Sequence, residues 1–349
     1  MNKEWVRSTA RGMTTYYSPK VGGKLRMDTS TNPLGCNPAA SKAVKECADM
    51  DLDQYPSTYS DGLRNELAKF YGLTRDNFIV GNGSDEMLDI LFKTFMEPGE
   101  TVITAYPAYS LHGFFVRING GKVTQIDLDD DYQLNVEDIN SAKGKMVIIC
   151  TPNNPTSNLL RKEDVKAIVE GCDRPVVVDE AYGEFAGESF MPLVDQYENL
   201  IVTRTFSKAY GLAGMRIGYM ASNLEMANVM QTVKIPYSLN RVSEHVAIAA
   251  LKDQSYVKES VATVNRERKH LADGLTRLGF HVFPSEANFI LFRSPKDSAQ
   301  LVSRLADKNV LIRDFGKLRR LENCVRTTIG TRDMNDELLE KLGQVVREW

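Results

Sequence analysis

Apolar and polar positions follow two alternating patterns up to about residue 240. Stretches of helical length, with apolar residues three and four positions apart, are separated by short runs that are apolar throughout. The helical pattern predicts helices at residues 61–72, 84–96, 162–171 and 225–233. The apolar runs predict strands at residues 78–80, 101–104, 146–150, 175–179 and 200–203. Because these runs are apolar on both faces, they predict a mostly parallel, doubly wound sheet in an α/β domain.

The pattern changes after about residue 241. A long helical stretch at 244–278, interrupted near 253–255, precedes a mixture of short strands and helices. Strands are predicted at 281–283, 288–292, 310–313 and 325–329, and helices at 299–308 and 335–347. This order indicates a smaller α+β domain. We therefore expect a large domain at 32–240, a small domain at 241–349 and a ligand in the crevice between them. Residues 1–31 are expected to form an arm on the small domain or on a partner subunit.

The composition, with 42% apolar and 26% charged residues, is that of a globular protein. A formal net charge of −3 without a basic patch gives no indication of binding to nucleic acid or to a membrane surface. No apolar run reaches the ~18 residues of a membrane helix, and the N-terminal segment does not look like a signal peptide, so a cytoplasmic location is expected. The five cysteines and four histidines lack the spacing of disulfide frameworks or metal sites, so no metal is expected.

The segment TFSKAYGLAGMRIGY contains a candidate reactive amine. Lys208 follows the predicted strand at 200–203 and is surrounded by small residues and glycines. A partly desolvated lysine near Arg216 has a lowered pKa, as a lysine that forms an imine requires. Arg216 and the hydroxyls of Thr205 and Ser207 can bind a phosphate group. The alternative is an ordinary surface lysine.

A second segment, VVVDEAYGEF, places a carboxylate directly after an apolar strand. A buried carboxylate needs a cation, and the N–H of a pyridinium ring can supply one, which keeps pyridoxal 5′-phosphate (PLP) an electron sink. Asp179 is therefore the candidate partner of a ring nitrogen, and Tyr182 and Asn154 are candidates for a ring oxygen. Alternatively, Asp179 caps the following helix and Asn154 belongs to a turn.

Further candidates lie near the ends of other predicted strands. Ser84, in GNGSDE, begins a helix whose free N–H groups form an anion site, unless the motif is only a helix cap. Tyr109 can stack on a flat cofactor or pack in the core. Arg313 and Arg326 can bind a carboxylate or a phosphate, although arginines in strands are usually exposed at an edge. His112 is close to Tyr109, but a packed or surface histidine is the expected role.

These motifs occur in one order together with YP, PAY, NNPT, EANF and VRTTIGT. The chain thereby resembles fold-type I PLP enzymes of the aspartate aminotransferase superfamily, and most closely the histidinol-phosphate aminotransferase branch. The resemblance covers nearly the whole chain. It implies the PLP-dependent transferase fold, with a large PLP-binding domain and a smaller α+β domain.

The resemblance also implies roles around the cofactor ring. Lys208 carries PLP as a Schiff base and then serves as the base and acid of the 1,3-prototropic shift. Asp179 holds the pyridinium nitrogen, and Tyr109 stacks on the ring. Tyr182 and Asn154 contact the ring oxygen.

Other implied roles concern the two phosphate groups. The backbone amides of Ser84 and Asp85, with Ser207 and Arg216, surround the cofactor phosphate. Tyr55 reaches the cofactor of a neighbouring subunit, which implies a homodimer with shared active sites. The substrate is implied to meet four residues, Tyr17, Asn32, Arg313 and Arg326. Arg326 resembles the arginine that grips the α-carboxylate across the superfamily, whereas in the branch it serves the substrate phosphate with Arg313 and Tyr17.

Three positions depart from the pattern of the branch. Residues 30–33 are STNP where the branch has Asn-Glu-Asn-Pro, and the form STNPLG looks more like threonine-phosphate decarboxylases of cobalamin biosynthesis. Ser157 stands where the usual pattern has glycine, so this turn is not expected to need a positive φ. Residues 236–240 read PYSLN instead of Pro-Tyr-Asn-Val-Asn.

The favoured hypothesis is a PLP-dependent aminotransferase that passes an amino group to 2-oxoglutarate. The expected donor is L-histidinol phosphate, as in histidine biosynthesis, or an aromatic amino acid. Two alternatives are kept. One is decarboxylation of threonine phosphate, and the other is a PLP-binding protein without catalytic turnover.

Overall fold

The computed structural model describes residues 2–11, 13 and 25–349. Its main element is a seven-stranded sheet with the strand order β2-β8-β7-β6-β5-β3-β4. The strands are β2 (Phe78–Gly81), β3 (Thr101–Tyr106), β4 (Lys122–Asp127), β5 (Met146–Cys150), β6 (Val176–Asp179), β7 (Leu200–Thr205) and β8 (Gly218–Ala221). Neighbouring strands are parallel except at β8, which runs antiparallel to β2 and β7. The predicted mostly parallel sheet is confirmed.

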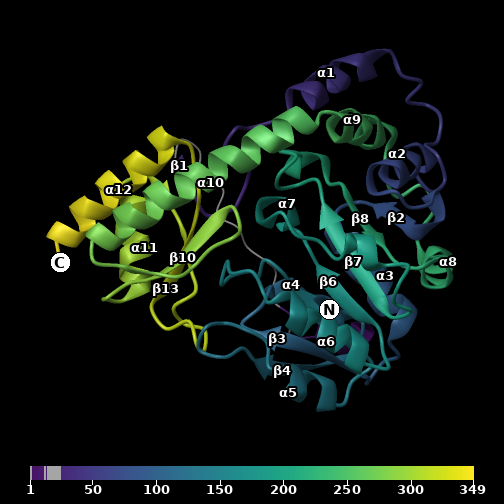
Figure 1. The fold of residues 1–349 in the computed structure, drawn as a ribbon, viewed down its shortest axis with the longest axis horizontal. Helices are drawn as coiled ribbons and strands as arrows, with labels where there is room; N and C mark the ends of the chain where they lie inside the picture. Colours follow the sequence, from purple (N-terminus) through teal and green to yellow (C-terminus); the bar gives the residue numbers. More distant parts are fainter. Residues whose placement is uncertain (1, 12, 14–24) are drawn as a thin grey trace.

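Helices cover both faces of this sheet (Figure 1). The helices before residue 240 are α1 (Pro38–Glu46), α2 (Asp61–Tyr71), α3 (Ser84–Phe95), α4 (Ser110–Ile118), α5 (Val136–Ser141), α6 (Lys162–Gly171), α7 (Gly183–Ala186) and α8 (Leu224–Val233), of which α1 packs on α9 and not on the sheet. Successive strand residues point to opposite faces. Val177 packs in a cluster with α3, α4 and α8, whereas Val176 and Val178 belong to a larger cluster with α2, α5 and α6. The sheet is therefore doubly wound.

A smaller antiparallel sheet lies beside the large one and has the order β12-β13-β10-β9 (Figure 1). Its strands are β9 (His281–Val282), β10 (Phe289–Arg293), β12 (Arg313–Asp314) and β13 (Cys324–Thr328). The helices α11 (Ser298–Asp307) and α12 (Arg332–Arg347) accompany it. The predicted strand at 310–313 is divided, because β11 (Val310–Leu311) pairs with β1 (Leu25–Arg26) and only β12 joins this sheet.

The long helical stretch after residue 240 is interrupted as the sequence predicts. α9 (Arg241–Lys252) ends at Asp253, whose side chain accepts the N–H of Tyr256 and so caps α10 (Gln254–Arg277). α9 packs on α1 and α2, whereas α10 contacts both α7 and α12. The division of the chain at residues 31 and 240 stays a prediction. Short 3-10 helices complete the described elements, at Lys3–Trp5, Ser8–Ala10, Cys47–Asp49, Arg75–Asn77, Met191–Leu193 and Ala213–Met215.

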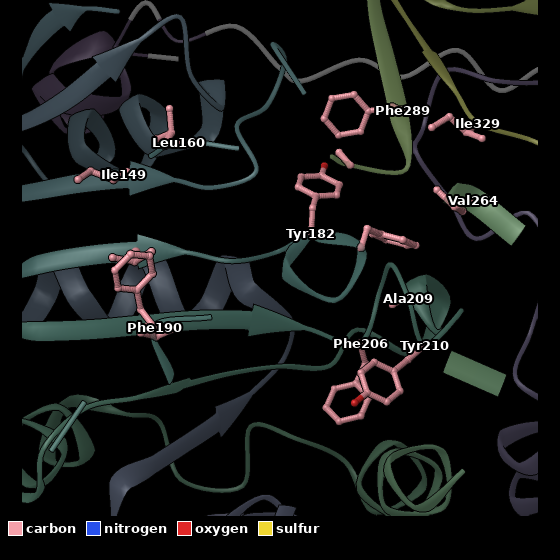
Figure 2. Close-up of a cluster of buried hydrophobic side chains, with 14 of the residues drawn as sticks. Ile149, Leu160, Tyr182, Phe190, Phe206, Ala209, Tyr210, Val264, Phe289 and Ile329 are labelled. Atoms are coloured by element: carbon pink, nitrogen blue, oxygen red, sulfur yellow. The ribbon is translucent and has the colours of Figure 1, made fainter. Parts of the chain in front are cut away.

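The core extends from the large sheet to the small one. Figure 2 shows Tyr182, which follows β6, next to Phe289 of β10. Their rings meet edge to face with centroids 4.9 Å apart, a favourable geometry for two aromatic rings. In the described part of the chain, no helix combines the length and apolar character that a membrane crossing requires.

Candidate active site

A cavity of about 670 Å³ lies at the carboxyl ends of β5, β6 and β7. It is bounded on the far side by the small sheet and by the segment that follows β1. Polar side chains collect here because parallel strands deliver their carboxyl ends to one edge of a sheet. Twelve residues singled out from the sequence line this cavity: Ser84, Asp85, Tyr109, Asn154, Asp179, Tyr182, Thr205, Ser207, Lys208, Arg216, Arg313 and Arg326.

Lys208 lies in a tight turn directly after β7. The hydroxyl of Thr205 accepts the N–H of Ser207 at 3.1 Å, and Gly211 continues the turn with a φ of +69°. A Cβ at Gly211 would lie 2.4 Å from the carbonyl oxygen of Gly35, so only glycine fits there. Nζ of Lys208 donates to the carbonyl of Thr29 at 3.3 Å. Burial, assisted by the positive charges of Arg326 and Arg216, lowers the pKa of Lys208 from 10.5 to about 8.

Asp179 is held rigidly at the end of β6. Its Oδ1 accepts the N–H of Ala181 at 3.1 Å and the hydroxyl of Thr203 at 3.2 Å. Its Oδ2 lies 3.1 Å from Nε2 of the buried His112. Nδ1 of His112 is buried and has no hydrogen-bond partner among the described residues, which favours the tautomer that donates from Nε2 to Asp179. The expected role of His112 as a packed side chain thus includes a contact with the site.

Tyr182 and Asn154 are joined by a hydrogen bond. Nδ2 of Asn154 donates to the hydroxyl of Tyr182 at 3.3 Å, and Oδ1 of Asn154 accepts from Arg326 at 2.6 Å. Burial raises the pKa of Tyr182, so its phenol keeps its proton and remains able to donate. Tyr109 precedes α4, and its ring meets the ring of His112 edge to face with centroids 5.4 Å apart.

The start of α3 forms an anion-binding corner of the cavity. Gly83, with a φ of +87°, precedes the helix, and no side chain in the described part of the chain caps it. A Cβ at Gly218 would lie 2.3 Å from the backbone nitrogen of Ser84, so β8 can approach the helix end only through a glycine. Arg216 donates to Asp85 at 2.9 Å, next to the backbone N–H groups of the first turn of α3. Helix N-termini of this kind bind phosphate.

The opposite wall of the cavity is rich in arginine. The guanidinium of Arg326 lies over the rings of Phe289 and Phe315, at 4.9 and 5.4 Å from their centroids. It also donates to the backbone carbonyl of Asp28 at 3.1 Å. For Arg313, no hydrogen bond or ion pair of the side chain occurs within residues 2–11, 13 and 25–349. A guanidinium in a cavity that none of the described side chains binds is suited to an anionic ligand.

Two described residues singled out from the sequence, Tyr55 and Asn32, do not line the cavity. The side chain of Tyr55 is 81% exposed and packs on Tyr237. Asn32 lies behind Lys208, where its amide donates to the carbonyl of Ala209 at 2.9 Å and to the hydroxyl of Ser260 at 2.7 Å. Tyr17 lies outside the described residues.

The turn after Asn154 differs from the expectation. Ser157 is fully buried and has a φ of +66°, so the turn does need the left-handed conformation that glycine adopts most easily. The expectation was wrong because the backbone is held by contacts on both sides. The N–H of Ser157 donates to Asn153 at 2.8 Å, and its carbonyl accepts from Glu286 at 2.8 Å. Tertiary contacts of this kind can outweigh an unfavourable backbone angle.

Sequence reasoning also missed two charged residues of the cavity, Arg26 and Asp28. They form an ion pair with two hydrogen bonds, of 2.7 and 3.0 Å. β1 contains only two residues, which is too short for a recognisable alternation of apolar and polar positions. No motif in the sequence pointed to this pair.

Comparisons with known proteins identify the family to which the chain belongs. A family model described as aminotransferase class I and II matches residues 23–342. The chain belongs to the class I and II aminotransferase family. This aminotransferase is 35% identical to a histidinol-phosphate aminotransferase of Caldanaerobacter subterraneus subsp. tengcongensis, over 99% of this chain and 100% of the relative.

Solved structures give the same family and fold. The aminotransferase matches a histidinol-phosphate aminotransferase from Sinorhizobium meliloti, in complex with PLP, with a TM-score of 0.87, 28% identity and coverage of 93% of this chain and 90% of that one. An L-threonine-O-3-phosphate decarboxylase from Porphyromonas gingivalis matches with a TM-score of 0.82, 24% identity and coverage of 92% and 99%. The latter likeness shows the fold alone. The aminotransferase is a fold-type I, PLP-dependent transaminase of the histidinol-phosphate aminotransferase-like branch.

The cavity fits PLP in three respects. A half-buried amine with a lowered pKa and a buried carboxylate line the same cavity, and the free helix end beside Arg216 suits a phosphate. Glycines stand at positions 83 and 218, where a Cβ would lie within 3 Å of Arg216 or of the backbone of Ser84. This corner therefore has no side chain of its own at these two positions that would fill the space for a phosphate. When bound, PLP supplies an electron sink that makes bonds at the substrate Cα easier to break.

Proposed function

We propose that this aminotransferase transfers the amino group of L-histidinol phosphate to 2-oxoglutarate. The observation that carries the proposal is the side chain of Arg313, which has no partner in the described chain and shares the cavity wall with the firmly held Arg326. The two guanidinium groups can bind the phosphate of the donor in one half-reaction and a carboxylate of glutamate in the other. The full-length likeness to histidinol-phosphate aminotransferases supports this donor.

We assign the proton transfer to Lys208. With a pKa of about 8, a useful fraction of its amine is unprotonated near neutral pH, and Nζ can take and return the proton at the substrate Cα. Asp179 would hold the ring nitrogen, because His112 and Thr203 fix its carboxylate in place. Tyr182 and Asn154 would hold the ring oxygen, and Tyr109 would cover the ring.

The phosphate of the cofactor would lie at the start of α3. Arg216 would bind it with the N–H groups of Ser84 and Asp85. The hydroxyls of Thr205 and Ser207, 2.9 Å apart, would complete the corner.

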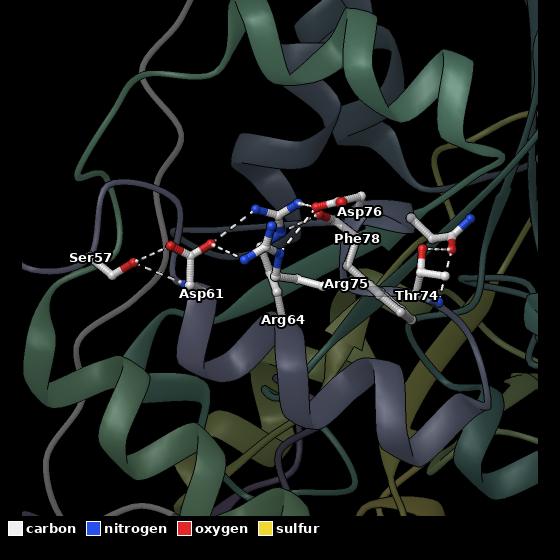
Figure 3. A network of polar contacts seen from close by, with 8 residues as sticks. Ser57, Asp61, Arg64, Thr74, Arg75, Asp76 and Phe78 are labelled. Carbon is white, nitrogen blue, oxygen red and sulfur yellow. Dashed lines mark hydrogen bonds and ion pairs between the residues drawn. The ribbon is translucent and has the colours of Figure 1, made fainter.

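We also propose a homodimer in which Tyr55 serves the site of the second copy. The exposed ring of Tyr55 packs on the exposed ring of Tyr237, and Leu52 and Ile235, close to them in the chain, are exposed as well. Exposed apolar side chains that lie together mark interfaces. Figure 3 shows how the segment after Tyr55 is anchored, since Ser57 bonds to Asp61 and Asp61 pairs with Arg64 at 3.3 Å.

Arg64 continues this anchor into the large sheet. It also donates to the carbonyl of Phe78 at 2.9 Å, at the start of β2, the strand that leads to the phosphate corner (Figure 3). Mixing Lys208→Ala with Tyr55→Phe subunits tests the shared site, because only a mixed dimer contains one complete site. Activity should rise on mixing, and no rise would contradict the shared site. The cytoplasmic location stays a prediction.

The function is tested by mixing PLP-loaded protein with single amino donors and following the absorbance of the cofactor. L-Histidinol phosphate and glutamate should each react, and glutamate should release 2-oxoglutarate. Arg313→Leu should raise KM for L-histidinol phosphate about tenfold or more, because a charge-assisted contact is lost. Arg304→Leu, on α11 away from the cavity, is the matched control. Absence of a half-reaction with every donor would contradict the proposal.

Two other donors are distinguished by the same assay. Phenylalanine and tyrosine should react more slowly than L-histidinol phosphate, because they bring no phosphate to Arg313. O-Phospho-L-threonine, suggested by the motif STNPLG, should release no carbon dioxide. If carbon dioxide appears without amino transfer, decarboxylation is the function.

A further inference from the structure

The segment between β1 and α1 forms a wall of the cavity and contacts several parts of the active site. The carbonyl of Thr29 accepts from Lys208 at 3.3 Å, and the carbonyl of Asp28 accepts from Arg326 at 3.1 Å. The N–H of Ser30 donates to Thr328 of β13 at 3.0 Å. These contacts fix the backbone of the segment against both the reactive amine and the arginine wall.

Asp28 presents a carboxylate in this wall. Its side chain is only 9% exposed, and both it and Arg26 line the cavity. Arg26 binds this carboxylate through two hydrogen bonds, of 2.7 and 3.0 Å. Two bonds to one guanidinium fix the plane of the carboxylate, which still has lone pairs for a further donor.

We infer that Asp28, oriented by Arg26, selects amino donors whose side chain carries a ring N–H, such as imidazole, over donors with a hydrocarbon ring. This inference rests on the proposed function, and it names the residues that choose between the histidinol-phosphate and aromatic donors. A donor with its amine at Lys208 and its anionic group at Arg313 lies in the same cavity as Asp28.

The selection follows from the free energy that is lost when a donor ring removes water from Asp28 and Arg26, which differs between the two kinds of ring. A phenyl ring against Asp28 and Arg26 removes water from both charges without replacing its hydrogen bonds. An imidazole N–H restores one hydrogen bond to the carboxylate. Sites built to bind a polar group discriminate strongly against an analogue that lacks it.

The test uses two donors that differ only in the ring, L-histidinol phosphate and L-phenylalaninol phosphate. For the wild-type holoenzyme, the ratio of kcat/KM should favour the imidazole by about tenfold or more. In Asp28→Leu, and in Asp28→Leu combined with Arg26→Met, this ratio should fall at least about fivefold. Asp28→Asn keeps an acceptor oxygen, so its ratio should lie between those of the wild type and Asp28→Leu.

Asp273→Leu is the control, because Asp273 pairs with Lys269 on α10 outside this cavity. Thermal unfolding of each variant shows whether it is folded, and Asp28→Asn alone suffices if the leucine variants are not. An unchanged ratio in the folded Asp28 variants overturns the inference while leaving the proposed function intact. If the wild type accepts neither donor, the proposed function itself fails.

Discussion

Asp179 and Glu180 are neighbours in the chain, yet they belong to two different electrostatic regions. Both carboxylates are almost fully buried, and they face opposite sides of the large sheet, as successive residues at a strand end do. Asp179 faces the cavity with Lys208. Glu180 faces away from it and binds Arg204, whose side chain is 7% exposed.

The second region satisfies its charges within the protein. Arg204 bonds to Glu180 at 2.7 and 2.9 Å and to Glu184 at 2.8 Å. Glu180 also accepts from Ser189 at 2.7 Å. We call Arg204, Glu180 and Glu184 the Arg204 cluster. A Cβ at Gly183 would lie 2.8 Å from the guanidinium of Arg204, so a larger residue at the start of α7 would push this guanidinium out of its present position.

Two cationic groups of the cavity, Lys208 and Arg313, have no ion-pair partner among the described residues, although Arg26 and Arg216 are paired with carboxylates. Lys208 has a lowered pKa and Arg313 has no partner in the described chain, whereas each charge of the Arg204 cluster meets an opposite one. The two sides of one strand end therefore have different roles. The side of Asp179 is built to bind a ligand, and the side of Glu180 is built to stabilise the fold. The cavity is expected to determine activity, and the cluster is expected to determine stability.

The largest expected effect is on activity. Lys208→Ala should lower the rate of amino transfer from glutamate at least about a thousandfold, because the group that moves the proton at Cα is lost. Single-turnover absorbance measurements check this. The free energy of unfolding of the cofactor-free variant should not fall, and a large fall would mean that the cavity also carries stability.

The next effect concerns the Arg204 cluster. Arg204→Leu should lower the free energy of unfolding by about 3–5 kcal/mol, because Glu180 is left as a buried charge without its partner. Denaturation by urea measures the change. The double variant with Glu180→Leu should recover part of the loss. If Arg204→Leu is as stable as the wild type, the Arg204 cluster does not determine stability.

A smaller effect depends on pH. The unfolded protein keeps the proton of Lys208 up to about its ordinary pKa of 10.5, whereas the folded, cofactor-free protein releases it near 8. The free energy of unfolding of the wild type should therefore rise with pH between these values. Lys208→Met should be more stable than the cofactor-free wild type by up to about 3 kcal/mol below pH 8. Denaturation at pH 7 and 9.5 should show this advantage shrinking, and a constant advantage would contradict the lowered pKa.

The smallest effect is expected at Glu184. Burial raises the pKa of this carboxyl, although Arg204 opposes the shift, and its Oε2 has no hydrogen-bond partner among the described residues. A raised pKa means that the ionised wild type loses stability as pH rises above about 4.5. Glu184→Gln should therefore be within about 1 kcal/mol of the wild type at pH 5 and equally or more stable at pH 8. Lower stability at pH 8 would show that the ionised carboxylate is needed.

The sequence by itself determined the sheet, the cofactor and most of the cavity. Strands such as β6 are apolar on both faces, and together with the helices between them this pattern is typical of a buried parallel sheet. Lys208, Asp179 and Arg216 lie in local motifs whose chemistry can be recognised without knowing what else is near them. Because these motifs follow strand ends, and parallel strands deliver their ends to one edge, the motifs converge.

Only the tertiary structure decided the contacts between segments that are distant in the chain. Three features depend on neighbours that no local pattern predicts. They are the pairing of Arg204 with Glu180, the contact of His112 with Asp179, and the left-handed turn at Ser157. The same holds for Arg26 and Asp28, which reach the cavity only because β1 pairs with β11. Local sequence sets the chemistry of a side chain, whereas burial, charge and partners come from the packing around it.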